Sequence, residues 1–122
     1  MILGIGVDTV DVADMARRLE RRTVLKVFSE AEKAYAYSRP RRRAEILAAR
    51  WAAKEAFGKA LGTGIRVDWP FHELEVVHDD ADRPTLRLGP ALADLLPEGA
   101  RIHLSLSHTP TLATAFVILE RV

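Results

Sequence analysis

The strongest constraint on the fold is residues 41–61, a proline-free stretch that predicts one long helix. The stretch contains seven alanines, which favour helix, and Gly62 follows it as a typical helix stop. On a helical wheel, one face consists of Ile46, Ala49, Ala53, Phe57 and Ala60. The opposite face consists of Ala48, Ala52, Glu55 and Lys59. Alanines on both faces predict close packing on both sides, with a sheet on one side and a ligand or a neighbouring subunit on the other.

The start of the chain predicts a strand followed by a helix. Residues 2–7 form a short apolar run that includes two glycines, which is typical of a strand. Thr9 or Asp11 can then cap a helix that we expect to run to about Arg22.

A capping box and several short patterns account for the rest of the chain. Ser29 and Glu32 have the spacing of a capping box, which predicts a helix that continues to about Tyr37. The second half predicts a short helix over 90–96 and strands over 73–78, 85–88, 101–107 and 112–120. Helices come mostly first and strands mostly later. We therefore expect an α+β fold, an antiparallel sheet packed with the long helix in a single domain over residues 1–122.

The composition excludes several kinds of protein. The chain has no cysteine, so disulfides and cysteine–zinc sites are ruled out. A net charge of only +1 disfavours a dedicated nucleic-acid binder, although residues 1–61 carry 13 Lys/Arg against 8 Asp/Glu and indicate an anion-facing surface. No apolar run approaches the roughly 18 residues of a membrane span, and the first residues do not resemble a signal peptide. We therefore expect a cytoplasmic protein without membrane contact.

Two carboxylates are candidate metal ligands. Glu55 lies among alanines and needs a cation partner if it is partly buried, and the simplest partner is Lys59 in an i,i+4 ion pair. Asp8 is expected at the carboxyl end of the first strand. Carboxylates are the ligands of magnesium, which leaves its other positions to water and phosphate. The alternative is that Asp8 or Asp11 only caps the following helix.

Basic side chains form a second set of candidates. His108 ends a strand at a turn, where it can donate to a phosphate, shuttle a proton, or have no role. Two arginine clusters are present, Arg17, Arg18, Arg21 and Arg22 in the first and Arg39, Arg41, Arg42 and Arg43 in the second. Each is either solvated surface or a contact for an acidic protein or a phosphate backbone.

Four segments in order resemble the holo-acyl-carrier-protein synthases, the small 4′-phosphopantetheinyl transferases, over nearly the whole chain. The segments are Gly4–Asp8, Phe28–Glu32, Arg50–Ala60 and Ser105–Thr109. Trp51 stands where phenylalanine is more usual, and residues 66–102 match only loosely. The resemblance implies an α+β fold and a homotrimer with active sites between subunits. It also implies transfer of the 4′-phosphopantetheine arm of coenzyme A to a serine of an acyl carrier protein, leaving adenosine 3′,5′-bisphosphate.

The resemblance also implies roles for particular residues. Asp8 and Glu55 match the magnesium ligands, with manganese as a possible substitute, and Glu55, Lys59 and His108 form the catalytic set. Glu55 is a ligand and can also be the base that takes the serine proton, directly or through water. The expected coenzyme A contacts are Arg50, Lys54, Lys59, Gly62, Gly64, Ser107, His108 and Thr109. The expected docking surface for the acidic carrier protein, from fatty-acid or polyketide synthesis, is Met15, Arg17, Arg18, Arg21 and Arg22.

Two other functions remain as alternatives from the residues alone. A small metal-dependent nuclease could use Asp8, Glu55 and Lys59, and turnover of coenzyme A without nuclease activity would exclude it. A non-enzymatic nucleic-acid-binding module could use the arginine clusters, and it predicts duplex binding that survives Glu55→Ala.

Overall fold

The computed structural model describes residues 1–62 and 69–122 of the chain. The helices are α1 (Val12–Leu19), α2 (Glu30–Tyr37) and α3 (Arg43–Ala60), with 3₁₀ helices at Arg22–Val27, Phe71–Glu73 and Pro90–Leu95. The strands are β1 (Ile2–Asp11), β2 (Leu74–His78), β3 (Pro84–Leu88), β4 (Ala100–His108) and β5 (Leu112–Arg121). The expected α+β class is confirmed.

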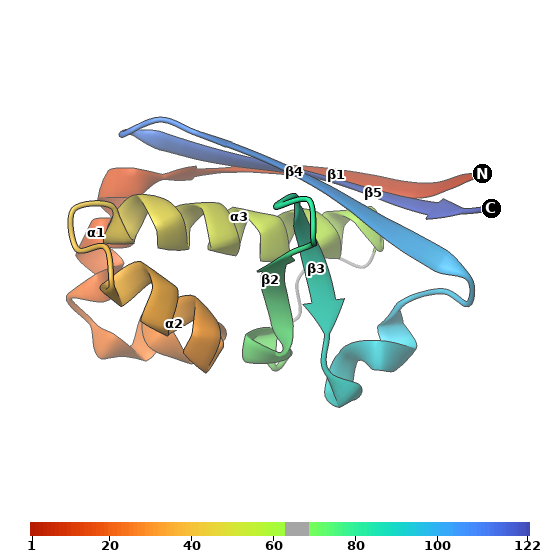
Figure 1. The fold of residues 1–122 in the computed structure, drawn as a ribbon, viewed down its shortest axis with the longest axis horizontal. Helices are drawn as coiled ribbons and strands as arrows, with labels where there is room; N and C mark the ends of the chain where they lie inside the picture. The colour runs from red at the N-terminus through yellow and green to blue at the C-terminus, as the bar shows by residue number, and fades with distance from the viewer. Residues whose placement is uncertain (63–68) are drawn as a thin grey trace.

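The strands form two antiparallel sheets on either side of α3. The larger sheet has three strands in the order β1–β5–β4, and the smaller is the β2–β3 hairpin. Figure 1 shows the three-stranded sheet along one side of α3, with α2 and the hairpin along the other side. Among residues 1–62 and 69–122, none of the helices combines the length and apolar character that crossing a membrane requires.

β1 lies directly against the backbone of α3. A Cβ atom added at Gly4 would be 1.9 Å from the carbonyl oxygen of Ala60, and one added at Gly6 would be 2.0 Å from that of Ala56. Only glycine permits this close approach. Because side chains alternate along a strand, Asp8 shares the α3-facing side of β1 with both glycines. The two glycines therefore bring Asp8 close to the helix that carries Glu55.

Both faces of α3 are buried, as the alanine pattern predicts, but by different partners than expected. Toward the C-terminal half, the alanines pack with sheet and hairpin residues such as Val117 and Leu74. Toward the N-terminal half, they pack with Met15, Phe28 and Ala36. The alanines on the side away from the three-stranded sheet are covered by α1, α2 and the hairpin of the same chain, and not by a ligand or a second subunit.

The first strand is longer than its apolar run indicates. β1 continues to Asp11 because β5 remains paired with it, Asp8 opposite Ala115 and Asp11 opposite Leu112. Asp8 thus lies within the strand and not at its end. The Asp11 carboxylate caps α1 by accepting from the backbone of the first turn, so the cap is Asp11 and not Thr9.

The other element boundaries agree with the sequence to within a few residues. The capping box at Ser29 and Glu32 is present in full at the start of α2. The first helix ends at Leu19, earlier than expected, and Arg22 begins a 3₁₀ helix. The short helix near residue 90 is also a 3₁₀ helix, Pro90–Leu95.

Candidate active site

Asp8 and Glu55 meet in a pocket where β1, α1 and α3 come together. The pocket has a volume of about 210 Å³ and is lined by Asp8, Thr9, Val10, Asp11, Asp14, Met15, Arg18, Trp51 and Glu55. β1 supplies Asp8 because the strand passes over α3, and the helix supplies Glu55 one turn before Lys59. Two acids that are far apart in the sequence therefore line one cavity, as the sequence predicts.

The charges around this pocket are not evenly matched. Lys59 Nζ donates to the Val7 carbonyl oxygen at 2.9 Å and to Asp8 Oδ1 at 3.1 Å. Among the described residues, Lys59 pairs with Asp8, so the simple i,i+4 pair with Glu55 is not the arrangement found. Burial and the charge of Asp8 raise the pKa of Glu55, while Lys59 and Arg18 oppose the rise. A second cation near both carboxylates would relieve their repulsion.

The donor set suits a magnesium ion. Within residues 1–62 and 69–122, no group of three or more His, Asp or Glu side chains is placed to hold a metal. Magnesium does not need such a cage, because it binds through one or two carboxylates and keeps water and phosphate as its other ligands. Asp8 and Glu55 are the pair that could hold it.

His108 lies at the end of β4 and is held by a residue that sequence reasoning missed. Its Nδ1 is hydrogen bonded to the carboxylate of Glu45, in the first turn of α3. Arg42 lies 3.9 Å from the same carboxylate. No local pattern could have indicated Glu45, because the pair joins positions 63 residues apart. Ser107 and Thr109 are exposed beside His108.

The structure contradicts the expected contact between Lys54 and coenzyme A. The Lys54 side chain is 0% exposed. Its ammonium donates to Glu32 Oε1 at 2.8 Å, to the Phe71 carbonyl oxygen at 2.9 Å and to the Leu74 carbonyl oxygen. An ammonium has three donors, so none is left for a phosphate. Of the two adjacent residues, Lys54 therefore lies in the interior and Glu55 lies in the pocket.

Arg50 remains a candidate anion contact, although little of it is exposed. The residue is 7% exposed, its guanidinium carbon lies 4.7 Å from the centre of the Tyr35 ring, and its Nε has no hydrogen-bond partner within the described chain. Burial lowers the pKa of Arg50, against the attraction of Glu32. Such a buried, incompletely bonded guanidinium can donate hydrogen bonds to an anion at its accessible edge.

Gly62, one of the two glycines expected at the coenzyme, lies away from His108. Gly62 is exposed with a φ of +79° directly after α3, so its role as a helix stop is confirmed. His108 contacts Glu45 at the other end of this 18-residue helix, which is about 27 Å long. The expected coenzyme contacts therefore do not converge within one chain. Gly64 lies outside the described residues.

The arginines of α1 and of the segment just after it form a surface beside the pocket. A groove is lined by Asp14, Arg17, Arg18, Glu20 and Arg21. Arg18 belongs to both this groove and the carboxylate pocket, so the two adjoin. Met15 is only 1% exposed and packs in the core, so its place on a docking surface is wrong. Arg22 is exposed just after α1.

Comparison with known proteins identifies the family. The sequence model of the 4′-phosphopantetheinyl transferase superfamily matches residues 4–117. The chain belongs to this superfamily. The transferase is 48% identical to the holo-[acyl-carrier-protein] synthase of Methylobacterium radiotolerans, an alignment that covers 98% of this chain and 94% of that protein. It is 41% identical to the enzyme of the same name from Halalkalibacterium halodurans, covering 99% and 98%.

Solved structures agree with this assignment. The holo-[acyl-carrier-protein] synthase of Neisseria meningitidis superposes with a TM-score of 0.86 at 34% identity, covering 99% of this transferase and 100% of that chain. The enzyme from Bacillus anthracis, solved in complex with CoA (3′,5′-ADP), gives a TM-score of 0.83 at 34% identity, covering 100% and 99%. The resemblance noted in the sequence, the fold class and the transferase activity are thereby confirmed.

Proposed function

We propose that this transferase moves the 4′-phosphopantetheine arm of coenzyme A to a serine of an apo-acyl carrier protein in the cytoplasm, with a magnesium or manganese ion held by Asp8 and Glu55. The observation that carries the proposal is the convergence of these two carboxylates in one pocket. The synthase similar to this chain that was solved with CoA supports coenzyme A as the donor. The family match favours transfer over the nuclease and nucleic-acid-binding alternatives.

The reaction displaces one phosphate oxygen by another. The serine oxygen bonds to the phosphorus that bears the phosphopantetheine arm, the bond from that phosphorus to adenosine 3′,5′-bisphosphate breaks, and the serine proton leaves. A magnesium ion, when bound, offsets the negative charge of the diphosphate and orients the leaving group. Lys59, already beside Asp8, adds a positive charge where negative charge develops. Glu55 is the proposed base that takes the proton, directly or through water.

His108 and Arg50 are proposed to hold the coenzyme. Glu45 is hydrogen bonded to His108 Nδ1, which orients the ring and leaves Nε2 as the nitrogen available to a phosphate. Ser107 and Thr109 offer hydroxyl groups at the same turn. This set replaces Lys54, whose donors are already used in the interior.

The arginines of α1 and of the segment just after it are proposed to dock the carrier protein. Arg17, Arg18 and Arg21 line one groove, and that groove adjoins the carboxylate pocket through Arg18. Carrier proteins of fatty-acid or polyketide synthesis are acidic. Electrostatic attraction would therefore bring a carrier serine toward Asp8 and Glu55, and it should weaken as salt screens the charges.

The active site is proposed to form between subunits of a homotrimer. The separation of His108 from Gly62 along α3 supports a site shared by two chains. The sheet face away from α3 supports assembly, because Ile5, Val7 and Phe116 are exposed on it. Sedimentation velocity at micromolar concentration should give a trimer, and a sample that contains only monomers would count against shared sites.

The decisive experiment is mass spectrometry of an apo-acyl carrier protein incubated with this chain, coenzyme A and magnesium. The carrier should gain the mass of one phosphopantetheine group. A matched reaction with the Asp8→Ala variant, and one with a chelator, should leave the carrier unchanged. No mass gain with the unmodified chain, or an equal gain with the variant, would contradict the proposal.

A further inference from the structure

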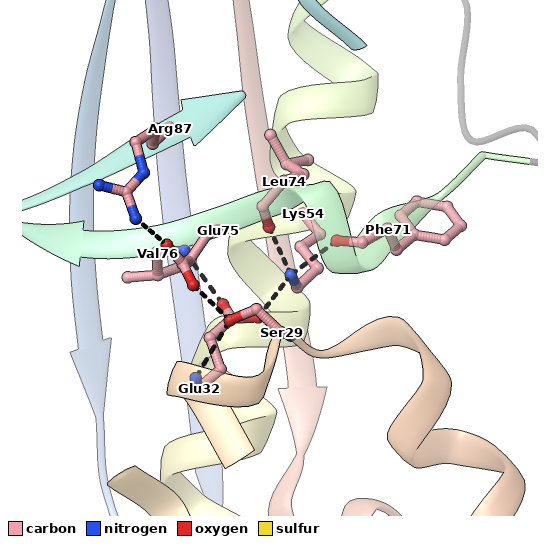
Figure 2. Close-up of polar contacts among 8 residues, drawn as sticks. All are labelled: Ser29, Glu32, Lys54, Phe71, Leu74, Glu75, Val76 and Arg87. Atoms are coloured by element: carbon pink, nitrogen blue, oxygen red, sulfur yellow. Dashed lines mark hydrogen bonds and ion pairs between the residues drawn. The ribbon is translucent and has the colours of Figure 1, made fainter. Parts of the chain in front are cut away.

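A buried ionic network lies on the side of α3 that faces α2 and the hairpin. Lys54 precedes Glu55 in the sequence, but it points toward α2 and β2, whereas Glu55 lines the pocket with β1 and α1. Figure 2 shows the Lys54 ammonium between Glu32 and the carbonyl oxygens of Phe71 and Leu74. Lys54 is 0% and Glu32 2% exposed. Neither charge contacts the pocket.

Every charged atom in this pair has hydrogen-bond partners. Lys54 uses all three ammonium donors, as described above. Glu32 Oε1 also accepts from the Ser29 backbone at 2.9 Å, and Oε2 accepts from the Val76 backbone at 3.0 Å. The pair therefore joins the start of α2, the middle of α3 and strand β2.

A second pair of contacts extends the network across the hairpin. Ser29 Oγ donates to Glu75 Oε2 at 2.5 Å, and Arg87 of β3 donates to Glu75 Oε1. Figure 2 shows these contacts continuing from Glu32 to the neighbouring strand. One connected set of polar groups thus links α3 to α2, to the 3₁₀ helix Phe71–Glu73 and to both strands of the hairpin.

An alanine-rich helix has a particular need for such a restraint. The buried faces of α3 consist largely of alanines, whose methyl groups form low ridges that resist rotation of the helix less than larger side chains do. The three hydrogen bonds from Lys54 end on groups outside α3, so a rotation of the helix about its axis would stretch or break them. A rotation of about 10° would move a carboxylate about 6 Å from the axis by roughly 1 Å. A misplacement of this size near the reacting atoms can cost roughly 10²-fold in rate.

We propose that Lys54, paired with Glu32, is a positioning residue that holds Glu55 at the distance from Asp8 that a shared ion requires. The inference depends on the proposed metal role of Asp8 and Glu55. A buried ion pair is weak evidence for stability, since apolar replacements of both partners often fold as well, and setting a unique geometry is its better-attested use. The network therefore acts on the site through the orientation of α3.

The test removes both charges while it keeps the local structure. In Lys54→Met with Glu32→Gln, the methionine preserves the apolar stem of the lysine, and the glutamine preserves the capping box with Ser29. The control is the same pair of changes at Lys33 and Glu30, an ion pair on the surface of α2. The measurements are Mn²⁺ affinity by electron paramagnetic resonance and steady-state kinetics with coenzyme A and carrier protein.

The double variant should fold but bind Mn²⁺ about tenfold more weakly, and its kcat should fall about 10- to 100-fold. KM for both substrates should change little, because no substrate contact is removed, and the control should match the unmodified chain. If the double variant does not fold, the single variant Glu32→Gln replaces it in the same test. Its Mn²⁺ affinity and kcat should both fall, but by less than in the double variant. A folded variant with normal Mn²⁺ affinity and kcat would overturn the inference. An unmodified chain without transfer, or with Mn²⁺ binding that survives Asp8→Ala, would overturn the proposed function itself.

Discussion

Lys54 and Lys59 lie five residues apart on α3, and each pairs with a carboxylate from another element. The Lys54 side chain is fully buried, and its three ammonium donors are all hydrogen bonded within the protein. The Lys59 side chain is 53% exposed, and it lies beside a pocket that holds a further carboxylate. The same residue type therefore serves the interior at one position and the site at the other.

The carboxylates on the two sides of α3 differ in the same way. Glu32 accepts from an ammonium and two backbone amides, so its charge is fully satisfied. At Glu55, burial and the repulsion of Asp8 raise the pKa. Satisfied buried charge indicates a structural role, whereas repulsion between carboxylates in a pocket that nearby cations only partly relieve indicates a site for a cation. Variants on the two sides of α3 can test this distinction.

The largest effect is expected at the carboxylate pocket. Asp8→Ala or Glu55→Gln should reduce transfer by at least about 10³-fold, because the group that offsets phosphate charge can no longer be held. Circular dichroism should remain that of the unmodified chain. Glu30→Gln, on the exposed surface of α2, is the matched control and should retain activity. Near-normal turnover in either site variant would contradict the metal role.

The two lysines should differ in their effect on stability. Lys54→Met should lower the free energy of unfolding by about 3–5 kcal/mol, because it leaves the buried Glu32 carboxylate unpaired. Lys59→Met removes a pair whose lysine is half exposed, and it should cost about 1 kcal/mol or less, while it still reduces transfer. Urea denaturation of both variants measures the difference. Equal losses would mean that the interior and site lysines are not distinct.

A smaller effect is expected at the docking surface. Arg17→Glu with Arg21→Glu should raise KM for the carrier protein roughly tenfold and leave KM for coenzyme A nearly unchanged. The difference should shrink as salt is added. Arg83→Glu, on the hairpin turn, serves as a control with one exposed arginine reversed. Equal changes in both KM values would argue against docking at α1.

The smallest effect is expected in how stability depends on pH when Glu75 or Glu55 is replaced. Burial raises the pKa of Glu75, but hydrogen bonds from Ser29 and Arg87 outweigh it and hold that pKa below its usual value. Glu75→Gln should therefore be less stable than the unmodified chain at neutral pH, and the gap should close as pH falls through the lowered pKa.

Glu55→Gln should behave in the opposite way in metal-free protein. A raised carboxyl pKa favours folding below the ordinary value near 4.3 and loses that contribution as pH rises through the raised value. The variant should thus melt higher than the unmodified chain at neutral pH, by on the order of 1–3 °C because the site is partly solvated, and equally at pH 3. Thermal melts at a series of pH values measure the melting temperatures of Glu75→Gln, Glu55→Gln and the unmodified chain. If both variants differed from the unmodified chain by the same amount at every pH, the two carboxylates would not differ in the way proposed.

Local patterns predicted most of the elements but fewer of the contacts. The capping box at Ser29 and Glu32 could be identified because its bonds join residues three apart. The extent of β1 could not, because Asp8 and Thr9 are polar and only pairing with β5 keeps them in the strand. The contact between His108 and Glu45 could not be predicted for the same reason, because no residue near either one in the sequence indicates the other.

The sequence by itself determined the class of fold and the family, and it identified Asp8 and Glu55 as candidates for one site, because helix periodicity, capping and motif spacing are local properties of the chain. Only the tertiary structure decided which of two adjacent residues, Lys54 or Glu55, faces the interior and which faces the pocket. Either arrangement of Lys54 and Glu55 is compatible with a helix that has alanines on both faces. The choice depends on what packs against each side of α3, and that is set by segments distant in the chain.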